Sequence, residues 1–115
     1  MKKVFILLFI LNFVVPVFAG NFAQELNNSI ARAKSGSIVQ YTLHFPDGKA
    51  QLFTGADFTS GRVIDQGGAP SSFELFNGTF EKKYNIIISL QNAIYYKLDI
   101  EKVDGKWEYK FHFYY

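Results

Sequence analysis

The chain contains no cysteine. This absence excludes disulfide bonds, cysteine-based zinc sites, thiol redox chemistry and a cysteine nucleophile. It also excludes a lipid anchor attached through an N-terminal cysteine. Small extracellular domains often depend on disulfides for their stability, so this chain must be stabilised by the packing of its core instead.

The first nineteen residues have the organisation of a secretory signal peptide. A basic start at Lys2 and Lys3 precedes an apolar run over residues 4–18, and Val17 and Ala19 occupy the −3 and −1 positions of a cleavage site. The run is shorter than the roughly 20 apolar residues that cross a membrane. The sequence therefore predicts a cleaved bacterial export signal, and we expect the product in the periplasm or outside the cell.

The expected product is a single domain over residues 20–115. It lacks an excess of charge of either sign. The whole chain has 12 Lys and Arg against 10 Asp and Glu, and two of the basic residues, Lys2 and Lys3, leave with the signal. The remaining charges balance, and no stripe of basic residues is present. The sequence thus predicts neither nucleic-acid binding nor a stable membrane anchor after cleavage.

Aromatic residues, in contrast, are abundant: 13 Phe, 7 Tyr and one Trp. An enclosed aromatic ring buries roughly 150–250 Å², so these rings can supply the core that disulfides do not. The alternation of residues along the expected strands assigns five of them to the interior: Tyr41, Tyr96, Tyr109, Phe111 and Phe113.

One helix is predicted over residues 21–35. Its apolar stripe is formed by Phe22, Leu26 and Ile30 at a spacing of four, Asn21 is a suitable N-cap, and Gly36 is a natural stop. A helix of this length is marginal alone, so the stripe must pack against a sheet.

The rest of the chain alternates between apolar runs and turn signals, which predicts strands. We expect strands over residues 38–45, 50–54, 62–66, 72–76, 79–82 and 84–90, followed by a C-terminal hairpin. Asn77-Gly78 is predicted to be a two-residue turn. Residues 67–71 are predicted to be the most flexible stretch, and the run Ile86–Ile88 is expected to be covered on both faces.

The C-terminal hairpin has a predictable register. A two-residue turn at Asp104-Gly105 places Leu98 opposite Phe111, within a face of eight apolar residues that also includes Ile94 and Ile100. The other face pairs Asp99 with Lys110, Lys97 with His112 and Tyr95 with Tyr114. A slip of one residue would mix the two faces.

These elements predict an α+β domain. One N-terminal helix would pack on a curved antiparallel meander of about six or seven strands, an order that resembles the architecture of cystatin-like folds. The alternative is a small β-barrel with a flanking helix.

No catalytic, cofactor-binding or metal-ligating residue is predicted. His44 and His112 lie on the polar faces of separate strands, where an exposed histidine is the default, and a metal site needs three or four converging ligands. No nucleophile elbow or phosphate-binding loop is present. The carboxylates in the middle of the chain show no defined pair; they are Asp57, Asp65, Glu74 and Glu81.

The candidate binding residues are Tyr95, Lys97, His112 and Tyr114, which share the outer face of the hairpin. Exposed paired tyrosines suit either a stacking platform for sugar rings or a protein interface. We expect a non-enzymatic binding domain that contacts another protein, as an inhibitor, an immunity-type protein or an envelope-associated factor, with residues 67–71 as a further contact. The alternative is a small-ligand pocket between helix and sheet, with weak hydrolytic or isomerase activity.

Overall fold

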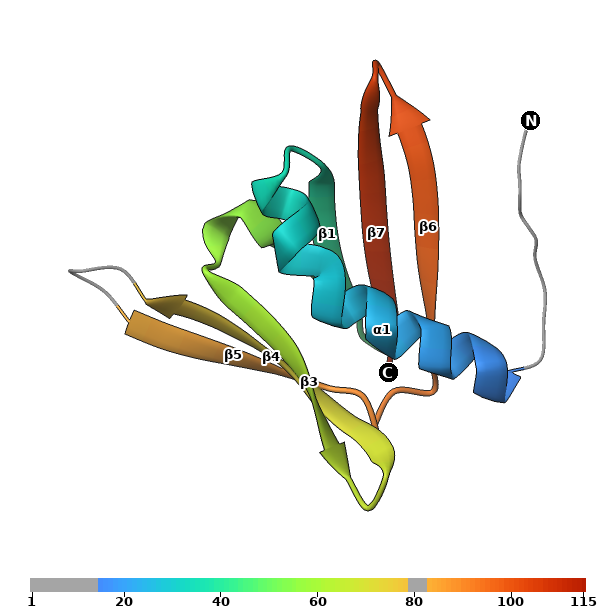
Figure 1. Ribbon diagram of the computed structural model, residues 1–115. Helices are drawn as coiled ribbons and strands as arrows, with labels where there is room; N and C mark the ends of the chain where they lie inside the picture. Colours follow the sequence, from blue (N-terminus) through green and yellow to red (C-terminus); the bar gives the residue numbers. More distant parts are fainter. Residues whose placement is uncertain (1–14, 79–82) are drawn as a thin grey trace.

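The computed structural model describes residues 15–78 and 83–115, which form one helix followed by seven strands (Figure 1). This order confirms the predicted α+β class with an N-terminal helix. The elements are α1 (Val15–Lys34), β1 (Ile38–His44), β2 (Ala50–Thr54), the short 3₁₀ helix η1 (Gly55–Asp57), β3 (Ser60–Gln66), β4 (Ala69–Gly78), β5 (Lys83–Ser89), β6 (Tyr95–Val103) and β7 (Lys106–Tyr114).

The strands form two open sheets rather than one continuous meander. One sheet has the order β2-β1-β7-β6, and the other has the order β3-β4-β5. Most neighbours are antiparallel, but β1 and β7 run parallel. The chain leaves the first sheet after β2, builds the second, and returns with β6 and β7. Neither sheet closes among the described residues, so the alternative of a small barrel is wrong.

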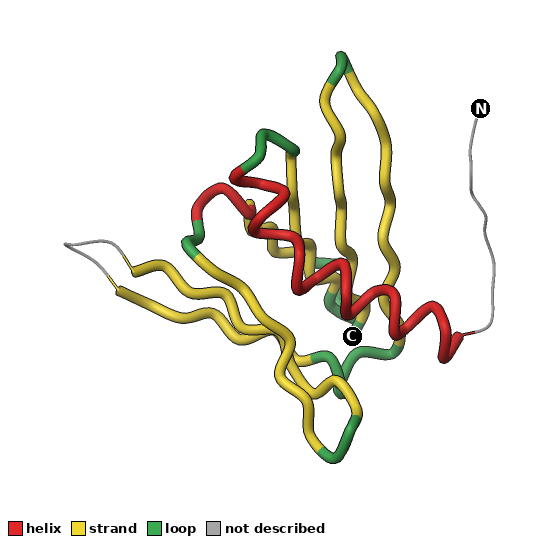
Figure 2. The backbone as a smooth tube through the Cα atoms, in the orientation of Figure 1, coloured by secondary structure: helices red, strands yellow, loops and turns green. Residues whose placement is uncertain are grey.

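Helix α1 lies across the two sheets (Figures 1 and 2), and its apolar stripe contacts both of them. Phe22, Leu26 and Ile30 are buried as predicted. The ring of Phe22 contacts that of Phe111 in the first sheet, with centroids 5.5 Å apart. Towards the second sheet, a Cβ atom at Gly61 would lie only 3.0 Å from Ile30, so the absence of a side chain there allows the close approach of helix and strand.

Aromatic rings join the sheets across the core. Tyr41 of β1 contacts Phe73 of β4 at 5.4 Å and Phe111 of β7 at 5.5 Å. The predicted interior rings of Tyr41, Tyr109, Phe111 and Phe113 are buried, and Tyr96 is half-buried. The core of this cysteine-free chain is thus largely aromatic.

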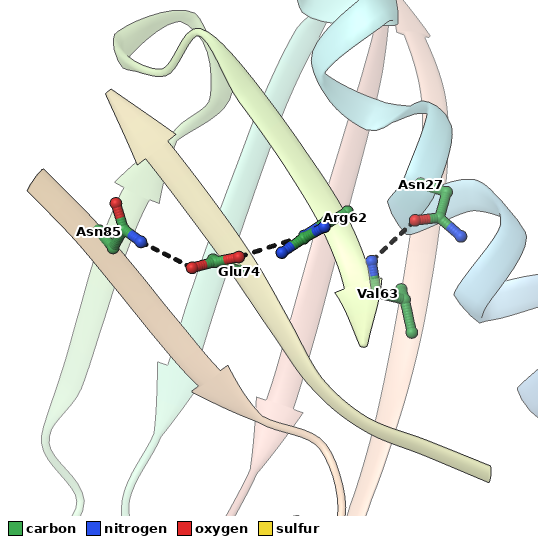
Figure 3. Close-up of polar contacts among 5 residues, drawn as sticks. All are labelled: Asn27, Arg62, Val63, Glu74 and Asn85. Carbon is green, nitrogen blue, oxygen red and sulfur yellow. Dashed lines mark hydrogen bonds and ion pairs between the residues drawn. The ribbon is translucent and has the colours of Figure 1, made fainter. Parts of the chain in front are cut away.

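Strand β3, at one edge of the second sheet, is hydrogen-bonded to the helix (Figure 3). The backbone N–H of Val63 in edge strand β3 donates to the side-chain oxygen of Asn27 in α1 at 2.7 Å. On the outer face of this sheet, Glu74 accepts hydrogen bonds from Arg62 at 3.2 Å and from Asn85 at 2.6 Å. These contacts tie the three strands together and give Glu74 a structural role.

Two local predictions were wrong. The described helix spans Val15–Lys34, so it already includes the residues before Asn21, and Asn21 is not its N-cap. Asn77 and Gly78 are not a turn but continue β4, opposite Tyr84 and Lys83. The Asn77 side chain donates to the Asp57 carbonyl at 2.7 Å, which holds this residue in the strand. The strand expected over residues 79–82 lies outside the described residues.

The glycine-rich stretch connects β3 to β4. Gly67 and Gly68 form a tight turn with positive φ angles, and Ala69 already belongs to β4. Ile87 was expected to be covered, but it is 64% exposed on the outer face of the second sheet.

The C-terminal hairpin has the predicted register. Asp104 and Gly105 adopt the positive φ angles of a two-residue turn, and Leu98 lies opposite Phe111. The apolar face is less buried than expected, because Ile94 and Ile100 are 78% and 48% exposed. The tip of the hairpin projects past the helix, which covers only the part nearer the C-terminus (Figure 1).

A buried polar contact links the helix to the first sheet. Ser29 donates to the Leu26 carbonyl at 2.7 Å, and its oxygen lies 2.6 Å from the Tyr41 hydroxyl. Because Ser29 has a single hydroxyl proton, Tyr41 must be the donor in the second contact. Burial raises the pKa of Tyr41, so the hydroxyl keeps this proton.

This geometry predicts unequal costs for removing the two partners. Ser29→Ala leaves the Tyr41 hydroxyl buried without an acceptor and should lower the free energy of unfolding by about 1–3 kcal/mol. Tyr41→Phe leaves Ser29 bonded to Leu26 and should cost about 0.5–1.5 kcal/mol. Urea denaturation measures both.

The double variant Ser29→Ala/Tyr41→Phe serves as the control, because it removes donor and acceptor together. It should be more stable than Ser29→Ala alone. Equal losses in the two single variants would contradict the assigned direction of the hydrogen bond.

Candidate functional site

The predicted binding residues meet on the outer face of the four-stranded sheet, which points away from the helix. Tyr95 lies opposite Tyr114, and Lys97 lies opposite His112, as the hairpin register predicts. Parallel pairing of β1 with β7 adds His44 beside Tyr114. We call the resulting group the outer-face cluster; its members are His44, Tyr95, Lys97, Asp99, His112 and Tyr114.

Three rings of the cluster form a stacked row across β6, β7 and β1. The centroids of Tyr95 and Tyr114 are 4.3 Å apart with an interplanar angle of 11°. Those of Tyr114 and His44 are also 4.3 Å apart, with an angle of 6°. The ring faces of Tyr114 are therefore covered by its neighbours, and the row presents mainly ring edges and polar atoms to solvent.

The two histidines form a polar chain beside this row. His44 Nε2 lies 2.9 Å from His112 Nδ1, and His112 Nε2 lies 3.4 Å from the Asp99 carboxylate. The negative carboxylate of Asp99 favours the tautomer of neutral His112 that carries its proton on Nε2. In that tautomer, His112 Nδ1 accepts from the Nε2–H of His44. The expectation of two separate, exposed histidines is therefore wrong.

Burial lowers the pKa of His112 below its ordinary value of 6.5. The carboxylate of Asp99 acts in the opposite direction on the pKa of His112, while the neighbouring His44, Lys97 and Lys110 add to the lowering. The His112 side chain is only 18% exposed, which agrees with burial as the main cause of the lowered pKa. His112 is accordingly neutral at pH 7, as the polar chain requires.

The histidine pair was missed because it has no local signal. His44 and His112 are 68 positions apart, and no turn connects their strands. Each strand was correctly assigned a polar face, but parallel neighbours are not joined by a hairpin. Had β1 been placed beside β7, the alternation of both strands would have put the histidines on one face.

The other candidate residues predicted from the sequence make contacts that support the fold. The Asp57 carbonyl and the Glu74 carboxylate take part in the contacts between strands described above. Ser71, in the glycine-rich stretch, donates to Gln91 at 3.3 Å. Glu81 lies outside the described residues. Asp57, Ser71 and Glu74 belong to the second sheet or its connections, whereas the outer-face cluster belongs to the first.

Two further classes of site are absent from residues 15–78 and 83–115. No group of three or more His, Asp or Glu side chains in this part of the chain is placed to hold a metal ion. Within the same ranges, no helix has both the length and the apolar character required to span a bilayer.

No protein-family model matches the chain, and no curated protein or solved structure gives a significant match. The candidate site is therefore interpreted from its own chemistry.

The histidine pair predicts that acidification destabilises the fold. Since the pKa of His112 is lowered in the folded state, the unfolded chain binds more protons between that pKa and 6.5. The contribution of neutral His112 to the free energy of unfolding is complete above pH 6.5. It is lost as the pH falls from 6.5 through the lowered pKa of His112. We expect urea denaturation to show a free energy of unfolding that decreases over the same range.

The variant His112→Gln keeps a polar side chain but has no titrating ring, so it isolates this contribution. Its stability should decrease less steeply with acidification than that of the unchanged protein. An identical pH dependence in both proteins would contradict a role for His112.

Proposed function

We propose that the protein is an exported, non-enzymatic domain that binds another protein in the bacterial envelope or outside the cell. The outer-face cluster is the proposed contact surface. The observation that carries this proposal is the stacked row of Tyr95, Tyr114 and His44 on the solvent side of the sheet. Tyrosine is enriched at the energetic centres of protein interfaces.

The stacking favours a protein partner over a sugar. A carbohydrate platform needs several open ring faces, but both faces of Tyr114 are covered by its neighbours, and the exposed surface of the row is mainly that of its end ring, Tyr95. The row instead offers ring edges, phenolic hydroxyls and imidazole nitrogens, which suit hydrogen bonds to a polypeptide. Lys97 and Asp99 add one charge of each sign, which suits the polar rim of an interface.

The row is also ordered before any partner arrives. Each ring is held by stacking on a neighbouring strand of the same sheet, so little side-chain entropy remains to be lost on binding. Tyr95 is 54% exposed at the end of the row and retains ample surface for contact. A rigid, half-exposed aromatic row is thus suited to act as a binding anchor.

The non-enzymatic part of the proposal is supported by the polar chain. His112 has Nδ1 engaged with His44 and Nε2 facing Asp99. A general base needs a free ring nitrogen within reach of the substrate proton. The arrangement therefore favours a structural role for His112, which fixes the neighbouring rings.

Surface contact is also favoured over an internal pocket. Where the pocket was expected, the ring of Phe22 lies 4.5 Å from that of Tyr96 and 5.8 Å from that of Phe113. Tyr41 reaches Phe73 of the other sheet at 5.4 Å. These rings occupy space between helix and sheets that a ligand would require.

Export is a proposal that depends on residues 1–19, and it predicts a defined product. Expression of the full chain in a bacterial host should yield, outside the cytoplasm, a protein whose N-terminal sequence begins at Gly20. The helix continues through this position from Val15, so cleavage would leave residues 20–34 to form the mature helix. Edman sequencing or intact-mass measurement of the periplasmic fraction provides the readout.

Ala19→Gln serves as the control, because it places a large side chain at the −1 position and should leave an uncleaved precursor. A mature protein that starts elsewhere, or an uncleaved chain in the cytoplasm, would contradict the export proposal.

The binding proposal predicts that Tyr95→Ala weakens partner binding. Truncation of an interface anchor typically costs about 2 kcal/mol or more, so we expect at least a roughly tenfold weaker Kd. The immobilised protein is incubated with envelope extract, retained proteins are identified by mass spectrometry, and the affinity for any stoichiometric partner is measured by calorimetry.

Trp107→Ala is the matched control. Trp107 is 47% exposed, close to the exposure of Tyr95, but it lies on the opposite face of the hairpin. Its truncation should leave the affinity unchanged. A partner that is lost equally with both variants would place the contact away from the outer-face cluster.

A further inference from the structure

The edge of the four-stranded sheet at β6 is open. Over residues 15–78 and 83–115, β6 pairs with β7 alone, and Figures 1 and 2 show no described strand beyond it. Such an edge presents unpaired backbone donors and acceptors that can bind another strand. We propose that β6 pairs in antiparallel orientation with β6 of a second copy of the chain, about a two-fold axis at Leu98.

The hairpin turn fixes which backbone groups are free. In a two-residue hairpin the pair next to the turn, here Val103 and Lys106, is hydrogen-bonded, and bonded pairs then recur at every second residue. The backbone groups of the residues between them point away from β7. Tyr96, Leu98 and Ile100 therefore offer their N–H and C=O groups to a strand at the open edge.

Strand β3, the edge of the second sheet that lies beside the helix, differs from β6 because one of its outward backbone groups is bonded. There the side chain of Asn27 accepts the outward N–H of Val63 in β3. No described side chain is recorded in a comparable bond to the outward groups of β6. At nine residues, β6 is also longer than β2, the five-residue strand at the opposite edge of its own sheet.

The charges of β6 select the register. With the axis at Leu98, Lys97 of each copy lies opposite Asp99 of the other, which gives two ion pairs in one dimer. Within one chain the Lys97 ammonium lies 3.9 Å from the Asp99 carboxylate; both side chains are about half exposed, at 48% and 55%, and both lie on the outer face, where a second copy can reach them. Directly opposed pairs of this type have closely spaced side chains, because they are not hydrogen-bonded pairs.

Of the neighbouring two-fold registers with the same backbone geometry, the axis at 96 would place Lys97 opposite Tyr95 and form no ion pair, and three others oppose like charges. An axis at position 97 would place Lys97 against itself, and an axis at 99 would place Asp99 against itself. An axis at 100 would place Asp99 against Glu101. Like charges directly opposite destabilise a strand pair, so the axis at Leu98 is favoured.

The inner face supports the same register. The axis at Leu98 places the two Leu98 side chains opposite each other. It also places Tyr96 of each copy opposite Ile100 of the other copy. Ile100 is 48% exposed in the single chain, and this pairing would cover it with an aromatic neighbour. Side chains on both faces are therefore self-complementary, which is why we infer a second copy rather than an unrelated peptide.

Charge substitutions at two positions test the proposal with the full chain expressed and the purified product studied by sedimentation equilibrium. Lys97→Glu should weaken the dimer at least roughly tenfold, because each of the two contacts between positions 97 and 99 then opposes one carboxylate to another. Asp99→Lys should do the same by opposing two ammonium groups. Circular dichroism establishes that each variant is folded.

An equimolar mixture of the two single variants gives the decisive result. In a heterodimer both contacts again join opposite charges, so the mixture should associate although neither variant does so alone. The exchanged variant Lys97→Glu/Asp99→Lys should dimerise within about threefold of the unchanged protein. A loss of stability unrelated to pairing would not be rescued by mixing.

Ile100→Pro tests the backbone contact independently of the charges. It removes an outward N–H at an edge strand, where proline is tolerated, and should abolish dimerisation while the chain remains folded. An unchanged protein that stays monomeric at millimolar concentration would overturn the proposal, because the charges would then protect the edge from pairing. A dimer that is insensitive to both charge variants, or a mixture that fails to associate, would also overturn it.

Discussion

The parallel pairing of β1 with β7 is the contact on which the core and the candidate site both depend. On the inner face it places Tyr41 against Phe111, with ring centroids 5.5 Å apart. On the outer face it places His44 beside Tyr114 and within 2.9 Å of His112. One pairing therefore sets both faces, because side chains alternate along a strand. A shift of β1 by one residue would remove an aromatic core contact and disperse the cluster at the same time.

The absence of disulfides explains why this core contains so many rings and so few polar contacts. A buried aromatic side chain removes a large area from water, but a buried tyrosine hydroxyl must also find a partner. Ser29 supplies that partner for Tyr41 from the helix. The same contact fixes the height of the helix over β1, while Gly61 permits its approach to β3. Polar and apolar constraints thus place α1 between the sheets in a single orientation.

Local patterns predicted the parts of this fold that are specified locally. The helix stripe of Phe22, Leu26 and Ile30 and the register set by Asp104-Gly105 follow from periodicity and turn chemistry within short segments. The division into two sheets could not be predicted in this way, since it depends on a pairing between strands at opposite ends of the sequence. For the same reason, Tyr95, Lys97, His112 and Tyr114 were brought together from the hairpin alone, whereas His44 was not. The turn predicted at Asn77-Gly78 was wrong because the side chain of Asn77 bonds to Asp57, a contact absent from any local pattern.

The two proposed contacts use different directions of the same strand. Side chains of β6 stand above and below the sheet, so Tyr95 and Lys97 project from its outer face. The free backbone groups of Leu98 and Ile100 lie in the plane of the sheet and point past its edge. A partner protein seated on the face and a second copy paired at the edge therefore approach along perpendicular directions. Pairing about Leu98 would extend the outer face across both copies and present two aromatic rows on one continuous surface. Association at the edge would in this way increase the valency of the face, and two linked sites bind a repeated or dimeric partner more tightly than one site does.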